Sequence, residues 1–416
     1  MDQATAKSAA DYPDTSRNRH LFGPGPKRIL AIDGGGVRGV ISLTFLAQIE
    51  TTLRVRTNNP KLRLCDYFDL VGGTSTGAII AAGIALGYSV ERLIDIYSSL
   101  STEGFKKSGK LVLGGYLAPK FKEAPLTKAI HDRVQDETLG SDKLLTGLAI
   151  VAKRLDSESV WVMHNNPRGK YYGDDDPAKK SKGIPNKDYP LRNLLRASTA
   201  APSYFTPQSI EVAHDDKGNV VKGAFVDGGV SPHNNPGLLM FMLSTLKGYG
   251  FRWPTGAEKL MLVSVGNGNA GDAPTHDRAT SIPSALLGVK SLSSMMRDCS
   301  ELNQALLQWM SRCPTPWQID SEIGNLADDQ LGAQALLHYI RYDVVLEADW
   351  LLEHPKLSYN PAELAKIRMF DRPELLTEWL KIGRRSAELQ VKPDHFPAAF
   401  DAIPQPVGSQ ATAGAQ

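Results

Sequence analysis

The chain contains little cysteine and no recognisable metal-ligand pattern. Its cysteines, Cys65, Cys299 and Cys313, are odd in number and far apart among 416 residues, which argues against a disulfide framework. No Cys-x-x-Cys or His-x-x-x-His spacing occurs. The acidic run at residues 174–176 lacks the alternating ligands and the glycine of a calcium loop, so we interpret it as a solvated loop. We therefore expect no metal and no cofactor.

The sequence also lacks a long hydrophobic run and a strong net charge. The best candidate for a membrane helix, residues 237–243, is far shorter than the roughly 18–20 apolar residues that a span requires. Residues 1–26 are polar and contain no apolar signal segment, so we expect a cytoplasmic protein and leave peripheral membrane contact open. The formal net charge of +2 argues against a nucleic-acid partner.

One segment still has the composition of a membrane-surface loop. Residues 104–117 combine Lys106, Lys107 and Lys110 with apolar residues and glycines. Such a loop can lie on anionic lipid headgroups beside a pocket. An ordinary solvated surface loop explains the same composition and is the more common case, so both interpretations stay open.

What the chain does contain is a serine in the setting of a nucleophile elbow. Residues 67–72 predict a buried strand, the pentapeptide Gly73–Gly77 (GTSTG) follows, and residues 78–86 predict a helix. A serine on such a sharp turn needs strained backbone angles, and small residues two positions before and after it prevent clashes. The turn exposes the hydroxyl, and the helix N-terminus stabilises developing negative charge. An ordinary glycine-rich turn is the alternative, but this order of elements favours a nucleophile at Ser75.

A second glycine cluster follows another predicted strand. Residues 28–32 predict a short buried strand, residues 33–39 (DGGGVRG) follow, and residues 40–50 have helical apolar spacing. Three consecutive glycines let backbone N–H groups converge on one point, where they stabilise the oxyanion of an acyl-transfer intermediate. The same letters satisfy a dinucleotide-binding pattern, which expects an acidic residue at a strand end roughly 20 positions later. Residues 54–61 form a polar linker there instead, so we disfavour nucleotide binding.

An aspartate followed by two glycines completes the set. Asp227 stands at the end of a predicted strand and precedes Gly228 and Gly229. A carboxylate there can orient and deprotonate a serine, whereas Asp-Gly by itself is a favoured hairpin turn. Because a carboxylate is a weak base near pH ~4, such a base should lie in a desolvated pocket that raises its pKa. Beside the other two motifs, we favour the base.

Together these motifs resemble the patatin-like phospholipase family, whose pattern is a D-G-G-G-x-R-G loop, a G-x-S-x-G nucleophile and a D-G-G/A aspartate. The blocks at residues 68–71, 196–205 and 234–236 match as well, and the similarity covers about residues 27–270. The resemblance implies a dyad of Ser75 and Asp227 without a histidine. It also implies hydrolysis of carboxylic ester bonds in phospholipids or related acyl lipids.

The resemblance assigns the remaining motif residues too. The oxyanion hole that it implies consists of Gly34, Gly35 and Gly36 with the backbone of Arg38. The other motif glycines are Gly39, Gly73, Gly77, Gly228 and Gly229. An effector-activated enzyme or a catalytically silent lipid-binding protein would carry the same motifs, and it is the second hypothesis for function.

A Ser-His-Asp triad is the alternative within the same reaction class. In α/β-hydrolases the histidine follows the acid in sequence. The histidines in that position are His233, His276, His338, His354 and His395. Only His233, six residues after Asp227, has a distinguishing context. Lipases of that fold favour His-Gly-Gly-Gly in the oxyanion loop, whereas this chain has Asp33 there, so we favour the dyad.

The chain is organised around one α/β catalytic domain. Between residues 27 and 282, short apolar segments such as 148–152 and 260–265 alternate with helical ones, which predicts a mostly parallel central sheet flanked by helices. Residues 283–402 have long helix-forming runs, so we expect a helical region packed on the core. Residues 1–26 and 403–416 have the composition of disordered segments. No oligomeric state is predicted.

Overall fold

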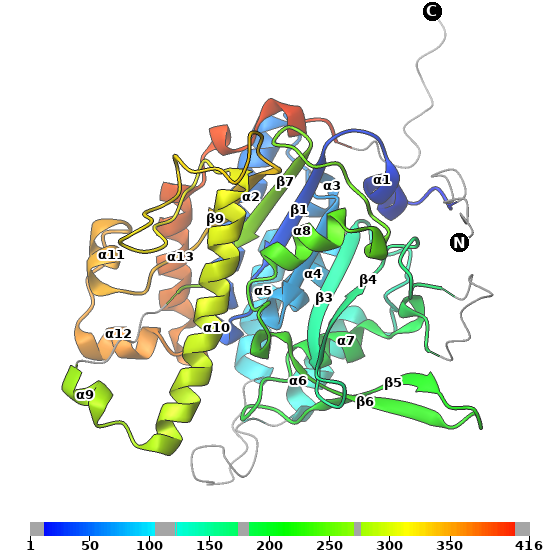
Figure 1. Ribbon diagram of the computed structural model, residues 1–416, viewed down its shortest axis with the longest axis horizontal. Coiled ribbons are helices and arrows are strands. Elements are labelled where there is room, and N and C mark those ends of the chain that lie inside the picture. The colour runs from blue at the N-terminus through cyan, green and yellow to red at the C-terminus, as the bar shows by residue number, and fades with distance from the viewer. Residues whose placement is uncertain (1–11, 105–120, 122, 174–182, 270–275, 404–416) are drawn as a thin grey trace, which may run out of the picture.

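A mixed, mostly parallel sheet lies at the centre of the molecule, with helices against both faces (Figure 1). The computed structural model describes residues 12–104, 121, 123–173, 183–269 and 276–403. In these residues the strands are β1 (Lys27–Ile32), β2 (Leu70–Thr74), β3 (Gly147–Arg154), β4 (Ser159–His164), β5 (Gln208–His214), β6 (Val220–Asp227), β7 (Leu260–Val265), β8 (Ser311–Arg312) and β9 (Leu337–Tyr342). Their spatial order is β5-β6-β3-β2-β1-β7-β9-β8, and β4 also pairs with β3.

Helices of very different length connect and cover these strands. The α-helices are α1 (Ser16–Phe22), α2 (Gly39–Arg56), α3 (Leu64–Tyr67), α4 (Thr76–Ala85), α5 (Val90–Gly104), α6 (Glu123–Val134), α7 (Leu191–Ser198), α8 (Gly237–Thr245), α9 (His276–Thr280), α10 (Ser284–Trp309), α11 (Ala348–Glu353), α12 (Pro361–Ile367) and α13 (Leu376–Gln390). Two one-turn 3-10 helices matter for the site, η2 (Gly36–Arg38) and η5 (Gly228–Val230).

The central strand β1 shows why both faces of the sheet are covered. All six of its residues are buried. Leu30 and Ile32 join the larger hydrophobic core, which includes side chains of α2, α4 and α13. Ile29 and Ala31 join a second core with side chains of α8 and α10. Successive side chains of a strand point to opposite faces, so a strand whose residues are all buried requires helices on both sides. The predicted α/β class is confirmed.

Parallel pairing brings two of the sequence motifs together. β1 pairs in parallel with β2 on one side and with β7 on the other. In the first pair Ile32 lies opposite Gly73, so both strands end at the same edge of the sheet. The glycine loop that follows β1 and the elbow that follows β2 are therefore neighbours, as sites of open α/β sheets are.

The C-terminal region contains the expected helices, α10 to α13, and it also supplies two strands that the sequence did not lead us to predict. β8 and β9 lie inside this region, and β9 pairs in parallel with β7 as part of the central sheet. All six residues of β9 are buried. Its sequence, LHYIRY, contains histidine and arginine, and the burial of these polar residues depends on partners from distant parts of the chain.

Two further expectations need correction at the level of single elements. Residues 12–26 are not disordered, because α1 forms there and buries Leu21 under the sheet, with the ring of His20 2.9 Å from Asp69 Oδ1. The strand before the elbow begins at Leu70 rather than at residue 67, because α3 occupies the preceding positions. Residues 1–11 and 404–416, which were expected to be disordered, lie outside the described residues.

Candidate active site

Ser75 lies on a strained turn between β2 and α4. Its φ of 56° and ψ of −127° are unusual for a residue with a side chain, and such strain costs about 1–3 kcal/mol. A Cβ atom on Gly73 would lie 2.3 Å from the carbonyl of Gly77. A Cβ atom on Gly77 would lie 2.3 Å from the carbonyl oxygen of Ile32 at the end of β1. The two glycines of the elbow therefore allow the turn to pack against the neighbouring strand.

The tight packing of Gly77 leads to a stability prediction. Gly77→Ala is expected to destabilise the fold by about 1–3 kcal/mol, because the three nearest atoms that the new methyl group would meet, in Ile32 and Asp33, all belong to the backbone. Gly248→Ala is the matched control, since a Cβ atom there meets nothing within 4 Å. Urea-induced unfolding measures both. Equal midpoints for the two variants would show that the elbow tolerates a side chain at position 77.

The hydroxyl of Ser75 donates a hydrogen bond to the carboxylate of Asp227, with 2.5 Å between Oγ and Oδ2. Asp227 ends β6, and it pairs with Ala152 of β3, one residue after the partner of Thr74. The other carboxylate oxygen, Oδ1, accepts the N–H of Gly229 at 2.7 Å. The two side chains, which are 152 positions apart in the sequence, thus meet at the same edge of the sheet.

Both members of this pair are removed from solvent. Ser75 is 8% exposed and Asp227 5%. Burial raises the pKa of Asp227 to about 6, although the hydrogen bonds from Ser75 and from the Gly229 N–H oppose the shift. A desolvated carboxyl with a raised pKa, the property expected of a base, therefore lies next to the Ser75 hydroxyl.

A second serine, which sequence reasoning did not single out, holds the elbow in place. The hydroxyl of Ser198, at the end of α7, accepts the backbone N–H of Ser75 at 2.8 Å and donates to the carbonyl of Val151 at 2.6 Å. Ser198 is fully buried. It belongs to the block of residues 196–205 that matched the family pattern, and that match was the only signal for it. The strained peptide at Ser75 is thereby tied to β3.

The glycine loop lies directly beside Ser75, and its N–H groups have different partners. A Cβ atom on Gly34 would lie 3.1 Å from that of Ser75. The Gly34 N–H donates to the Asn234 carbonyl at 3.1 Å, and the Gly35 N–H donates to the hydroxyl of Thr76 at 3.2 Å. Gly36 has a left-handed φ of 56°. Among the residues that the structure describes, its N–H group has no hydrogen-bond acceptor.

The other residues expected in the oxyanion hole and its motifs lie around this point. Arg38 closes η2, and its side chain donates to the carbonyl of Arg368 at 2.9 Å. Gly39 begins α2, where a Cβ atom would lie 2.4 Å from the hydroxyl oxygen of Tyr97. Gly228 packs against the carbonyl of Val151. The three motifs therefore converge on one place.

The histidines are not arranged as a triad in the described residues. Ser75 Oγ bonds to Asp227 rather than to an imidazole. His233 contributes its backbone carbonyl, which accepts the hydroxyl of Thr74 at 2.6 Å, and its Nδ1 has no partner within the described chain. The rings of His338 and His395 bond to other groups, a backbone carbonyl and a tyrosine hydroxyl. The geometry favours the carboxylate as the neighbour of the serine.

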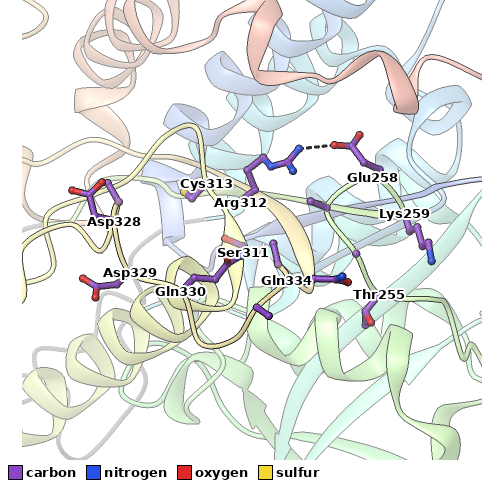
Figure 2. Close-up of a pocket in the computed structure, with 15 residues that line it drawn as sticks. Thr255, Glu258, Lys259, Ser311, Arg312, Cys313, Asp328, Asp329, Gln330 and Gln334 are labelled. Atoms are coloured by element: carbon purple, nitrogen blue, oxygen red, sulfur yellow. Dashed lines mark hydrogen bonds and ion pairs between the residues drawn. The ribbon is translucent and has the colours of Figure 1, made fainter.

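A cavity of about 620 Å³ lies at the opposite end of the sheet (Figure 2). It is lined by residues just before β7, such as Glu258 and Lys259, and by Arg312 of β8, which bonds to Glu258 at 2.5 Å. They lie at the amino ends of β7 and β8, and because β7 runs parallel to β1 this is the edge away from the three motifs. Because Ser75, Asp227 and the glycine loop all lie at the other edge, we place the candidate site there.

Two negative observations apply to the described residues only. Within ranges 12–104, 121, 123–173, 183–269 and 276–403, no helix is long and apolar enough to cross a bilayer. Among the same residues, no group of three or more His, Cys, Asp or Glu side chains could hold a metal ion. The segment 104–117, for which both a membrane-contact loop and an ordinary surface loop were left open, lies outside these ranges apart from Gly104, as does the acidic run at 174–176.

Comparison with known proteins supports the motifs. The family model for patatin-like phospholipase matches residues 30–240, which is just over half of the chain. The chain is 30% identical over 209 residues to a cGAMP-activated phospholipase of Escherichia coli (strain TW11681), covering 50% of this chain and 53% of the relative. It is 29% identical over 224 residues to patatin group J-1 of Solanum tuberosum, covering 52% and 53%. The chain thus spans about half the length of these relatives.

Solved structures give a weaker likeness. Human GIVD cytosolic phospholipase A2 aligns with 91% of this chain and 59% of its own, at 11% identity and a TM-score of 0.40. VipD from Legionella pneumophila aligns with 88% and 66%, at 14% identity and a TM-score of 0.32. Membership rests on the family model and on the three motifs that it spans. This chain belongs to the patatin-like phospholipase family.

Proposed function

We propose that this protein is a phospholipase A-type lipid acyl hydrolase, which cleaves carboxylic ester bonds of phospholipids or related acyl lipids through a covalent acyl-enzyme. Ser75 is the nucleophile, Asp227 is its base, and the N–H groups of the glycine loop stabilise the oxyanion. The observation that carries the proposal is the 2.5 Å hydrogen bond between Ser75 Oγ, on a strained elbow, and a buried carboxylate with a raised pKa.

The acylation half of the reaction follows from these positions. Asp227 accepts the proton of the Ser75 hydroxyl as Oγ attacks the ester carbonyl carbon. The negative charge that develops on the carbonyl oxygen is stabilised by the glycine loop and by the N-terminus of α4. In the loop, the Gly36 N–H is the donor without an acceptor among the described residues, whereas the N–H groups of Gly34 and Gly35 already donate to Asn234 and Thr76. Collapse of the tetrahedral intermediate breaks the ester bond. The leaving alcohol takes the proton from Asp227, and the acyl group stays on Ser75.

Deacylation reverses the roles of the same groups. Asp227 accepts a proton from water, which attacks the acyl carbon, and then returns the proton to Ser75 Oγ as the fatty acid leaves. Because the substrates are lipids, we include contact with a membrane surface in the proposal. The segment 104–117 is the candidate for that contact on its composition.

Release of fatty acid from vesicles tests the proposed activity. Vesicles of phosphatidylethanolamine and phosphatidylglycerol are incubated with the full chain, with and without cGAMP, because the E. coli relative is named as a cGAMP-activated phospholipase. We expect free fatty acid and a lysophospholipid. A folded protein that releases no fatty acid in either condition and gives no fluorophosphonate adduct on Ser75 would contradict the proposal and favour a silent lipid-binding protein.

The raised pKa of Asp227 predicts the pH dependence of Ser75 reactivity. Because the carboxyl must be ionised to accept a proton, the rate of fluorophosphonate labelling should rise with pH, pass its midpoint at about 6 and then level off. Labelling rates from about pH 4.5 to pH 8 measure this profile. A rate that stays constant across this range would contradict Asp227 as the base.

Another carboxyl beside the site requires a control. Burial also raises the pKa of Asp33 to about 6, against the opposing charge of Arg341. If Asp227 is the titrating base, Asp33→Asn should lower the labelling rate without moving the midpoint. A midpoint that disappears in Asp33→Asn would assign the titration to Asp33 instead.

A further inference from the structure

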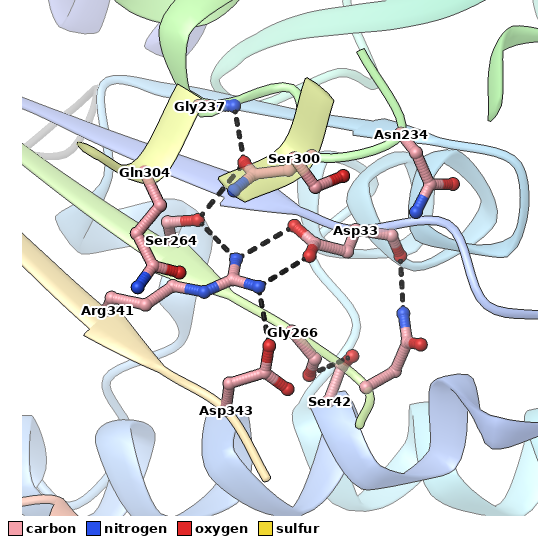
Figure 3. A network of polar contacts seen from close by, with 12 residues as sticks. Asp33, Ser42, Asn234, Gly237, Ser264, Gly266, Ser300, Gln304, Arg341 and Asp343 are labelled. Carbon is pink, nitrogen blue, oxygen red and sulfur yellow. Dashed lines mark hydrogen bonds and ion pairs between the residues drawn. The ribbon is translucent and has the colours of Figure 1, made fainter. Parts of the chain in front are cut away.

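The glycine loop receives a charged contact from the C-terminal region, beyond the residues that the family model matches. Arg341 lies in β9, opposite Ser264 of β7, and Ser264 lies opposite Ala31 of β1. Side chains at these aligned positions share one face of the sheet. Asp33, two residues after Ala31, stands where the glycine loop begins. The guanidinium of Arg341 crosses the small side chain of Ser264 and reaches this carboxylate (Figure 3).

The contact between Arg341 and Asp33 is bidentate and buried. Nη1 donates to Asp33 Oδ1 at 3.0 Å, and Nη2 donates to Oδ2 at 2.7 Å. Nη1 also donates to Ser264 Oγ at 2.7 Å, and Nη2 to Asp343 Oδ2 at 2.6 Å. Arg341 is 4% exposed and Asp33 6%. Two parallel N–H···O bonds fix the direction of a carboxylate as well as its charge.

The direction of this carboxylate matters because the same residue connects β1 to the oxyanion loop. The backbone carbonyl of Asp33 packs against Gly77 of the elbow and accepts the side-chain amide of Asn267 at 3.2 Å. A buried carboxylate without its cation must take up a proton or find other donors. The N–H groups nearest to it along the chain are those of Gly34, Gly35 and Gly36, the expected oxyanion donors.

Two more contacts from the C-terminal region hold the far side of the loop. The N–H of Val37 donates to the carbonyl of Phe370 at 2.8 Å, and Arg38 donates to the carbonyl of Arg368. We propose that Arg341 is a positioning residue, which orients Asp33 and thereby holds the glycine loop in the geometry that stabilises the oxyanion. The region after residue 282 is thus a component of the active site. This inference rests on the proposed function for its kinetic consequence only.

The chain offers a matched control at the start of β1, the strand that leads into Asp33. Arg28 of β1 donates to the carboxylate of Asp69 at 3.0 and 3.1 Å, and the two residues are 2% and 0% exposed. This pair is as buried as that of Arg341 and Asp33 and is also bidentate, although Arg28 donates through Nε and Nη2 and Arg341 through its two Nη atoms. Four residues of β1 lie between Arg28 and Asp33, where the glycine loop begins, which places the two about 16 Å apart along the strand. Arg28→Met and Arg341→Met each remove the arginine of a buried pair, but in Arg28→Met the carboxylate of Asp69 keeps the ring of His20 and the backbone N–H of residue 28. Arg28→Met therefore controls for the loss of a buried arginine on β1, and we expect it to lose no more stability than Arg341→Met.

Hydrogen exchange of the backbone amides tests the inference without relying on activity. In Arg341→Met, peptides that cover residues 34–39 should exchange at least about tenfold faster than in the wild type, while Arg28→Met leaves them unchanged. Arg341→Lys keeps the positive charge but loses the guanidinium that binds both carboxylate oxygens, so its exchange rate should be intermediate. Equal protection of residues 34–39 in Arg341→Met and in the wild type would overturn the inference.

The kinetic test separates positioning from stability. With a soluble ester, Arg341→Met should lower kcat by about 10- to 100-fold and leave KM within about twofold, because the oxyanion donors act in the transition state. Arg28→Met should keep the wild-type kcat per folded molecule, and Arg341→Lys should recover part of the loss. An inactive wild type would contradict the proposed function, whereas an active wild type with an equally active Arg341→Met would contradict the role of Arg341.

Discussion

Replacing Ser75 with alanine is expected to abolish both ester hydrolysis and covalent labelling by a fluorophosphonate. The hydroxyl is the atom that would carry the acyl group, and Asp227 accepts its hydrogen bond at 2.5 Å. Removing the nucleophile of a serine hydrolase lowers kcat on the order of 10⁴-fold or more. Fatty-acid release from vesicles measures the hydrolysis, and intact mass after treatment with the probe measures the adduct.

A glycine at the same position provides the matched comparison. Ser75→Gly also removes the hydroxyl, so it should be as inactive as Ser75→Ala. Its backbone, however, adopts a φ of 56° without strain, so it should be more stable than the alanine variant by about 1 kcal/mol. Hydrolysis or an adduct in either variant would show that another residue is the nucleophile.

Replacing Asp227 with asparagine is expected to leave the fold intact and to remove most of the turnover. An amide has nearly the shape of the carboxyl, and its oxygen can still accept the N–H of Gly229. It cannot accept a proton from Ser75, so kcat should fall on the order of 10³-fold. Binding of vesicles should be unchanged. Near-normal turnover would contradict the dyad and point to a histidine base, with His233 as the first to test.

The same substitution should raise stability above neutral pH. The pKa of Asp227 is raised by burial from 3.8 to about 6, so its ionised form costs the fold about 3 kcal/mol. Because the pKa of Asp227 is higher in the folded than in the unfolded protein, the protonated carboxyl stabilises the fold below about pH 4. That stabilisation is lost as the pH rises through about 6. Asparagine does not ionise.

Unfolding free energies at two pH values check this expectation. At about pH 8 the Asp227→Asn variant should exceed the wild type by about 1–3 kcal/mol, and the difference should shrink toward about pH 4. Asp33 ionises over the same pH range, but it is present in both proteins, so its contribution to the unfolding free energy cancels in the difference. A variant that is less stable than the wild type at both pH values would show that the carboxylate stabilises the fold. In that case the ionised carboxylate that the proposed activity requires would not cost the fold stability.

The local parts of the site could be predicted from the sequence because their physical causes are local. A strained turn needs glycine near the serine, and convergent N–H groups need consecutive glycines, so both are visible in a few adjacent letters. The strand, turn and helix order around Ser75 is confirmed by β2 and α4, with the strand starting three residues later than predicted. The α/β class followed from alternating apolar segments.

Other features have causes that span the whole chain, and they were missed or wrong. The strand β9 was taken for part of a helical region, because the burial of its histidine and arginine depends on distant partners. Residues 12–26 were expected to be disordered, because their polar composition does not show the partners of α1. One of these partners is Asp69, which contacts His20 from 49 positions away. Ser198 was not singled out, because its contact with the backbone N–H of Ser75, 123 positions away, depends on where the fold places the end of α7.

The sequence by itself determined the elbow, the glycine loop and the aspartate, because glycine content and the order of short apolar segments restrict the backbone locally. Only the tertiary structure decided which groups meet. It sets Asp227 at 2.5 Å from Ser75 across 152 positions, and Arg341 against Asp33 across 308. Such pairs depend on strand register and on burial, and burial raises the pKa of the Asp227 carboxyl from 3.8 to about 6.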